Sequence, residues 1–293
     1  MFKNIAPFTF LLAFSAAASA EEALPSLDIA KAEFNYTDGM DFEDADGTLN
    51  ASSFELSSFV AKPLDIFGGF KLIPQVRYRL TSLDFDGVDP SFPIADEDLH
   101  SLAMSVFALK MEDSSPWIYG GFARAEMASD FQHINGDDFT FDLAGGAGYR
   151  FNSDFIAGFG VAVINMNGDL RVFPGINFDW AVSKEIRVGL YGPNLVASYT
   201  PSKDWSISLR GEPRGGNWNI TDDGGQSHSI DFSSYQVGLF ATRRIVDKLW
   251  LTGGVGTSFI NEISLTEPRG EEITSEDLEG GLFYQIGLSL KTW

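Results

Sequence analysis

Three histidines, His100, His133 and His228, are the candidates for a general base in this chain. Nucleophilic catalysis needs a histidine that an acid orients and that lies within reach of a nucleophile. His133 and His228 fall in predicted loops. His100 precedes Ser101 in a predicted strand, where adjacent side chains face opposite ways. Because the chain also has no Cys, three scattered histidines do not form a zinc site. The sequence therefore predicts a protein that is not an enzyme and uses no cofactor.

Carboxylates are concentrated in three polar segments, 38–46, 84–98 and 262–279. Carboxylate oxygens suit hard divalent cations, but the spacing of an EF-hand loop is absent: counted from Asp41, the sixth position is Asp46 where that loop has glycine. The pattern favours a solvated anionic surface, with divalent cations held loosely between it and neighbouring lipopolysaccharide. A net charge of −21 also argues against nucleic acid as a partner, because a general basic patch is missing.

A second set of charged residues lies within predicted strands, on the face opposite to the apolar one. Charges of both signs inside a barrel can tune the ion selectivity of a water-filled pore, or they can pair and plug the interior. The sequence leaves both possibilities open. The expected interior charges are Lys71, Arg77, Arg79, Arg124, Glu126, Asp179, Arg187, Arg210 and Glu212, and Glu55 has the same character.

The elements that must position these charges are strands, because apolar and polar residues alternate with a period of two. In the last predicted strand, Leu282, Tyr284, Ile286, Leu288 and Leu290 form one face and Phe283, Gln285, Gly287, Ser289 and Lys291 the other. About fourteen strands are expected, and twelve if the short pair within 186–200 does not form. The predicted strands are 27–37, 51–62, 69–84, 99–111, 117–128, 140–151, 155–165, 170–182, 186–191, 195–200, 205–212, 231–245, 249–260 and 280–293.

The connections between these strands alternate in length. Short turns such as 152–154, 183–185 and 202–204 alternate with polar segments at 38–50, 84–98, 129–139, 213–230 and 261–279. Short turns on one rim and long loops on the other are typical of outer-membrane barrels. A soluble β-sandwich shows the same alternation along each strand, but not this alternation of connections. We therefore expect an all-β fold, an antiparallel transmembrane β-barrel.

The N-terminal segment 1–20 reads as a secretory signal peptide. Lys3 supplies the positive charge, an apolar run follows, and Ala18-Ser19-Ala20 is a cleavage site of the A-x-A type. We expect cleavage after Ala20 and a single barrel domain over 21–293. Beyond the signal, no apolar run reaches about 18 residues, the length that a membrane-spanning helix needs. The sequence thus predicts export to the bacterial outer membrane.

The segment Gly280–Trp293 is expected to be the last barrel strand, through which the barrel-assembly machinery recognises the chain. It ends in an aromatic residue, as such assembly signals commonly do. Trp293 is out of phase with the apolar face, because the alternation places Thr292 outward. A bulge near Lys291, or a position just past the last ladder pair, would account for this.

Several turn motifs resemble those of an uncharacterised family of outer-membrane β-barrel proteins, a domain of unknown function. They are Phe173-Pro174-Gly175-Ile176, Trp180-Ala181-Val182-Ser183, Gly192-Pro193-Asn194-Leu195 and Ser198–Trp205. The resemblance covers most of the chain after the signal and implies a membrane barrel. It implies neither a substrate nor functional residues.

Three functions remain as hypotheses. The first is a porin-like passive channel for small solutes, based on polar residues inside a wide barrel. The second is a structural or surface-interaction barrel whose acidic loops contact ions, lipid or a partner. The third is a soluble exported β-protein, which would need no detergent to stay in solution.

Overall fold

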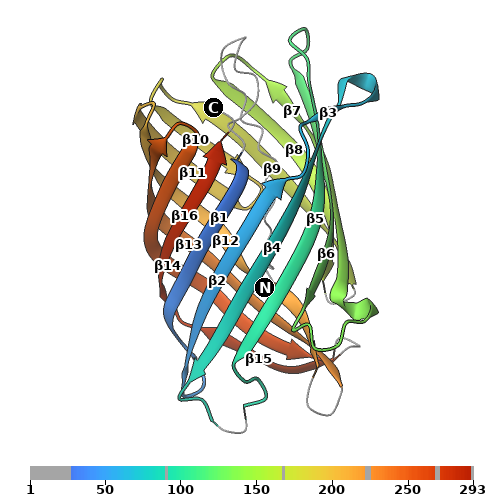
Figure 1. The fold of residues 1–293 in the computed structure, drawn as a ribbon, viewed down its shortest axis with the longest axis vertical. Coiled ribbons are helices and arrows are strands. Elements are labelled where there is room, and N and C mark those ends of the chain that lie inside the picture. The colour runs from blue at the N-terminus through green and yellow to red at the C-terminus, as the bar shows by residue number, and fades with distance from the viewer. Residues whose placement is uncertain (1–27, 90–91, 167–168, 222–225, 268–270, 292–293) are drawn as a thin grey trace.

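The computed structural model describes residues 28–89, 92–166, 169–221, 226–267 and 271–291, and it is an all-β molecule (Figure 1). The predicted signal peptide 1–20, its cleavage site and Trp293 lie outside the described residues. The strands are β1 (Asp28–Asp41), β2 (Thr48–Phe59), β3 (Leu64–Asp65), β4 (Lys71–Asp86), β5 (Glu97–Met111), β6 (Trp117–Ser129), β7 (Phe139–Arg150), β8 (Phe155–Met166), β9 (Asp169–Ala181), β10 (Ile186–Tyr191), β11 (Asn194–Ser202), β12 (Trp205–Thr221), β13 (Ser227–Val246), β14 (Leu249–Thr266), β15 (Glu272–Leu278) and β16 (Leu282–Lys291).

Two short 3₁₀ helices, η1 (Phe67–Gly69) and η2 (Gly136–Asp138), lie in connections between strands. Among the described residues, neither helix has the length and hydropathy needed to cross a membrane.

The strands form one closed antiparallel barrel. The sheet has sixteen strands, of which β3 pairs with β4 and β15 pairs with β14 outside the ring. The other fourteen pair in chain order, and β1 pairs with β16 to complete the ring. The prediction of a barrel with about fourteen strands is confirmed, and β10 and β11 both belong to it.

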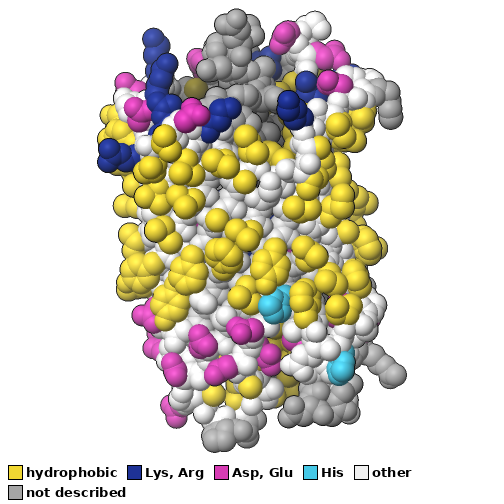
Figure 2. All heavy atoms as spheres, in the orientation of Figure 1, with side chains coloured by type: hydrophobic (Ala, Val, Ile, Leu, Met, Phe, Trp, Pro, Cys, Tyr) yellow, Lys and Arg dark blue, Asp and Glu magenta, His cyan; other side chains and the backbone are white. Residues whose placement is uncertain are grey.

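The alternation of side chains sorts the wall into an apolar outside and a polar inside. On β16, Leu282, Tyr284 and Ile286 are at least half exposed, whereas Gln285 between them is 5% exposed. On the face shown in Figure 2 the outward residues form an apolar belt, in yellow, with Lys and Arg among Asp and Glu above it and many Asp and Glu below it. We call the upper rim, with its short connections, the turn end, and the lower rim the loop end.

Several segments that were predicted as loops are strands in part, so those predictions are wrong. β12 runs to Thr221 rather than ending at 212, β13 begins at Ser227, and β14 runs to Thr266 and pairs with β15. The predicted loop 38–50 is likewise shortened by β1 and β2, and the loop 84–98 by β4 and β5. Beyond the apolar belt, outward side chains meet water and inward ones pack a core. The hydropathy therefore inverts there, and the strands read as polar loops.

These extended strands enclose an apolar core at the loop end. Trp218, Met40, Leu49, Ile230 and Ile263 are at most 1% exposed within it. Its strands are β1, β2, β4, β5 and β6 on one side and β12, β13 and β14 on the other, together with β15. We call the described parts of the β12–β13 hairpin at 215–221 and 226–234 the cap hairpin. The core places this hairpin across the loop end of the barrel.

Candidate functional site in the barrel interior

One group of interior charges joins β12 to β1 across four steps of the ring. The Arg214 guanidinium donates to Glu33 at 3.0 Å and to the Gln285 side-chain oxygen at 2.8 Å, and it also pairs with Glu212. Gln285 in turn donates to Glu33 at 2.7 Å, and the Lys31 ammonium lies 2.6 Å from the same carboxylate. The carboxylate of Glu33, which is 4% exposed, is therefore surrounded by donors.

Arg79 makes a second connection across the lumen. Its Nε and Nη2 donate to Glu55 on the neighbouring strand at 3.2 and 3.0 Å. Its Nη1 donates to the carbonyl of Gly215 on β12, at 2.8 Å and six steps around the ring. An arginine fork thus fixes the backbone at the start of the cap hairpin.

A third group lies along β4, β6 and β7. Arg77 pairs with Glu126 at 3.0 Å, Arg124 pairs with Glu126 at 3.2 Å, and Arg124 also pairs with Asp142. Their side chains are between 4% and 18% exposed, so the pairs are largely screened from water. Charges held in this way give the interior a rigid ion-pair network.

The cap hairpin touches the opposite wall directly. Trp218 Nε1 donates to the Ser101 hydroxyl at 2.9 Å, and β12 and β5 are seven steps apart in either direction around the ring. Next to it, Asn219 forms a parallel bridge with Ser129 of β6 and donates to Asp138 of η2 at 2.7 Å. The two walls of the barrel therefore meet at the loop end.

Gly215 gives β12 the bend that this contact requires. Its φ of +108° is in the region that side chains with a Cβ rarely adopt. A Cβ at this position would lie 1.9 Å from the carbonyl oxygen of Phe232 on β13. Only glycine therefore fits where the strand turns inward.

The outer side of the cap hairpin is polar and faces β9. Asn217 donates to Asp231 at 3.4 Å, and Arg171 of β9 attracts the same carboxylate. Asp231 lies beyond the apolar belt, because its outward neighbours along β13 are Ser229 and Ser233. Burial raises the pKa of Asp231 to about 6; the Asn217 hydrogen bond opposes this rise, and the charge of Glu262 adds to it.

On this same side of the hairpin, the interior along β7 to β11 is lined by small residues. Gly146, Gly158, Gly160 and Gly175 lie on the inner face of β7, β8 and β9. Asp179 and Arg187 form an ion pair at 2.9 Å there, and the Arg187 side chain is 38% exposed. We call this part of the interior the open side, because glycines line it and the Arg187 side chain remains partly exposed.

The wall is also lowest on this side. The β10–β11 hairpin ends at Tyr191 and Asn194, and β10 pairs only with residues 177–181 of β9. On the far edge, β11 pairs with β12 no further than Gly211. Toward the loop end, residues 169–176 of β9 have no ladder partner on this side among the described residues, and β12 beyond Gly211 has there the bridge between Asn219 and Ser129 of β6.

The structure brings together most of the charges expected from the sequence. Arg77, Arg79, Arg124, Glu126 and Glu212 join the ion-pair network, and Asp179 pairs with Arg187 on the open side. Arg210 faces the interior nearer the turn end, where it lies over the Phe240 ring. Lys71 does not join them: it is half exposed at the rim and pairs with Asp65.

Sequence reasoning missed Lys31, Glu33, Asp142 and Arg214. The alternation of Lys31, Glu33 and Asn35 with Ala32 and Phe34 was a sufficient signal for the first two. Arg214 falls in the polar segment 213–230, which the sequence predicts as a loop. Its role depends on a contact with a strand far away in the chain, which no local pattern reveals.

For His100 the prediction agrees with the side-chain directions in the structure, whereas the prediction that His228 lies in a loop is wrong, because this residue belongs to β13. His100 lies on the outer face, where Nδ1 shares a 2.8 Å hydrogen bond with the Tyr78 hydroxyl and the ring stacks on Phe131. Ser101 points inward to Trp218. Within the described residues, no group of three or more His, Cys, Asp or Glu side chains could hold a metal ion.

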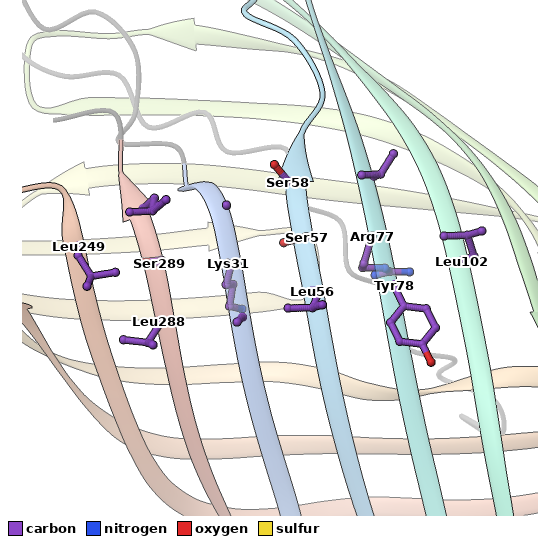
Figure 3. Close-up of a pocket in the computed structure, with 14 residues that line it drawn as sticks. Lys31, Leu56, Ser57, Ser58, Arg77, Tyr78, Leu102, Leu249, Leu288 and Ser289 are labelled. Atoms are coloured by element: carbon purple, nitrogen blue, oxygen red, sulfur yellow. The ribbon is translucent and has the colours of Figure 1, made fainter.

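Two depressions lie outside the lumen. An apolar groove of about 440 Å³ runs along the outer wall (Figure 3), with Leu56, Leu102 and Leu288 among its lining residues. It is part of the apolar belt. A polar cleft of about 650 Å³ lies between the acidic loops at the loop end, beside Glu43 and Asp46.

Solved structures that align with the chain include an outer-membrane channel, a porin and a FadL homologue. The COG4313 outer membrane channel from Pseudomonas putida F1 aligns with a TM-score of 0.47 and 12% identity over 92% of this chain and 97% of that chain. A FadL homologue of Pseudomonas aeruginosa aligns with a TM-score of 0.33 and 9% identity over 90% of each chain. The KdgM porin aligns with a TM-score of 0.35 and 8% identity over 89% of this chain and 98% of that one. At these identities the likeness concerns the fold.

Among curated proteins, no match to the chain is found. A family model described as "Domain of unknown function (DUF6268)" matches residues 85–291, which is more than half of the sequence. This match confirms the resemblance seen in the turn motifs. The chain belongs to the DUF6268 family.

Proposed function

We propose that this protein is a channel of the bacterial outer membrane for small solutes, and that the cap hairpin holds its extracellular end shut. The observation that carries the proposal is the hydrogen bond between Trp218 and Ser101, which joins opposite walls of the barrel. The ion-pair network between β12 and strands β1 and β4 supports the same closed arrangement.

The apolar belt supports placement in a membrane. A closed barrel satisfies every backbone group within the bilayer, and lipid takes the place of water on its outer face. Exposed side chains such as Phe159 and Ile176 (66% and 67%) face outward, while the interior is charged. A soluble β-protein would have the opposite distribution. The turn end carries both the start of β1 and the end of β16, so it is the periplasmic end and the loop end is extracellular.

The open side supports conduction rather than a solid plug. A ring of fourteen strands is wide enough to enclose more than side chains. On β7, β8 and β9 several inner positions are glycine, which adds no side chain to the lumen. Solute would pass along this side once the cap hairpin moves.

The test is single-channel conductance in planar bilayers. We expect low current from the wild-type protein and a current several-fold larger from Trp218→Ala. The matched control is Trp180→Ala, because that indole is on the outer face and 48% exposed. Folding of each variant is checked by its gel shift on heating.

Two results would overturn the proposal. If neither the wild type nor folded Trp218→Ala conducts, the protein is not a channel. If both conduct equally well, the cap hairpin does not close it.

The acidic surface favours a second role, contact with lipopolysaccharide through divalent cations. The cleft at the loop end is lined by Glu43, Asp44 and Asp46, and lipid phosphates could approach these carboxylates only through cations. Replacing all three with their amides should weaken Ca²⁺-dependent binding of lipopolysaccharide to the purified barrel. Unchanged binding would contradict this second role and would mean that the acidic loops are only a solvated surface.

A further inference from the structure

Arg210 and Lys291, on the inner face at the turn end, do not take part in the ion-pair network. Arg210 of β12 and Lys291 of β16 face the lumen, and within the described residues no carboxylate lies within 4.0 Å of either. Asp28 is the register partner of Lys291 on β1 and attracts it from a longer distance. Network residues such as Arg79 and Arg214, in contrast, are already neutralised by carboxylates.

Aromatic rings hold these two cations in place. The Arg210 guanidinium carbon lies 4.5 Å from the centroid of Phe240, and the Lys291 ammonium lies 4.9 Å from that of Trp250. Arg210 Nε donates to the Ser208 hydroxyl at 2.9 Å. Because a guanidinium has five N–H groups, the terminal nitrogens of Arg210 keep donors for a ligand.

The positive charges of Arg210 and Lys291 repel one another. An anion placed between them would relieve this repulsion and accept charged hydrogen bonds from both, which are stronger than neutral ones. The neighbouring rings would give an organic anion an apolar surface to contact. Thr242 and Thr252 hydrogen-bond to each other beside the rings, so their hydroxyls add polarity without charge.

We propose that Arg210 and Lys291, backed by Phe240 and Trp250, form a binding site for small organic carboxylates on the periplasmic side of the lumen. The proposal names the solute class and rests on the proposed channel function. The structure would then select anions at its inner mouth although its outer surface is acidic.

The first experiment measures selectivity in the Trp218→Ala background, which we expect to conduct. In a KCl gradient, Arg210→Gln combined with Lys291→Gln should shift the reversal potential toward cations. Block of the current by benzoate, the probe used here, should weaken about tenfold or more, because charged hydrogen bonds are lost. Lys248→Gln is the matched control, because it removes one exposed cation from a turn outside the inner face.

The second experiment does not depend on conductance. Benzoate is titrated into the folded wild-type protein in detergent while tryptophan fluorescence is recorded. The contribution of Trp250 is the part of the signal that is missing in Trp250→Phe. We expect saturable quenching that Arg210→Gln abolishes and Lys248→Gln leaves intact.

The outcomes separate this site from the channel. Quenching without current in any variant supports the site and overturns the channel. Current with an unchanged reversal potential and no saturable quenching overturns the site and leaves the channel standing.

Discussion

Trp218 of β12 and Ser101 of β5 form a 2.9 Å hydrogen bond between strands on opposite sides of a fourteen-strand ring. Both residues are nearly inaccessible, at 1% and 4% exposure. Strands that contacted only their neighbours in the ring could not form this hydrogen bond. The cap hairpin is therefore folded into the barrel rather than standing above it, and its movement is the property that the following predictions test.

A disulfide across the closed end should lock the cap hairpin. Ser129 and Asn219 are partners in a β-bridge, which brings their Cα atoms close enough for a disulfide, and the chain has no cysteine of its own. The test protein combines Ser129→Cys and Asn219→Cys with Trp218→Ala. Oxidation should form the disulfide and suppress the current that Trp218→Ala opens. Reduction should restore it. Equal currents in the oxidised and reduced forms would contradict the gate.

Glycine at position 215 should be required for stability. In Gly215→Ala, the new methyl group would meet the Phe232 carbonyl and the backbone would be strained, at a cost of roughly 1–3 kcal/mol in the free energy of unfolding. Urea unfolding in lipid vesicles measures this cost. Gly175→Ala is the control, because a Cβ there meets nothing within 4 Å. Equal stability of the two variants would show that the bend is not needed.

Removing Glu33 should be far more costly than removing an ion pair at the rim. Glu33→Ala leaves Lys31 and Arg214 without their shared carboxylate in a buried site, and breaking such a pair costs about 3–5 kcal/mol. Lys71→Ala removes a pair that is exposed to solvent, for which about 0–1 kcal/mol is expected. Both losses in the free energy of unfolding are to be measured in the same urea unfolding assay. Similar costs would mean that the network contributes no more than surface charges do.

The cap hairpin should loosen as the pH rises. The pKa of Asp231 is about 6 in the folded protein, above its ordinary value of 3.8, because the side chain is buried. The folded state therefore prefers the protonated form. The stability that this preference contributes is complete below pH 3.8 and is lost as the pH rises through 6.

Between pH 5 and pH 7.5 this loss amounts to roughly 1 kcal/mol for the hairpin. The groups that face the carboxyl are Asn217 on β12, Glu262 on β14 and Arg171 on β9. Proteolysis of the hairpin, or channel opening, should increase over this range in the wild type and change less in Asp231→Asn. An equal pH dependence in both proteins would assign the effect to another group.

Much of the barrel follows from the sequence by itself. Alternation with a period of two is a local property, because successive side chains of a strand face opposite ways. It places Leu282 and Leu288 outward and Arg77 and Glu126 inward, and it locates all fourteen strands of the ring. The same pattern separates most interior charges from loop charges; the exceptions are Lys71, which lies at the rim, and Arg214, which falls in a predicted loop and joins the interior network.

Tertiary structure alone decided how the interior is closed. The bond from Arg79 to Gly215 and the contact of Trp218 with Ser101 depend on how far β12 bends across the ring. Local alternation also gives wrong predictions beyond the apolar belt. There the outward side chains of a strand are polar, because they meet water, and the inward ones are apolar, because they pack a core. For this reason the chain around Gly215 looks like a loop in the sequence and is a strand that closes the barrel in the structure.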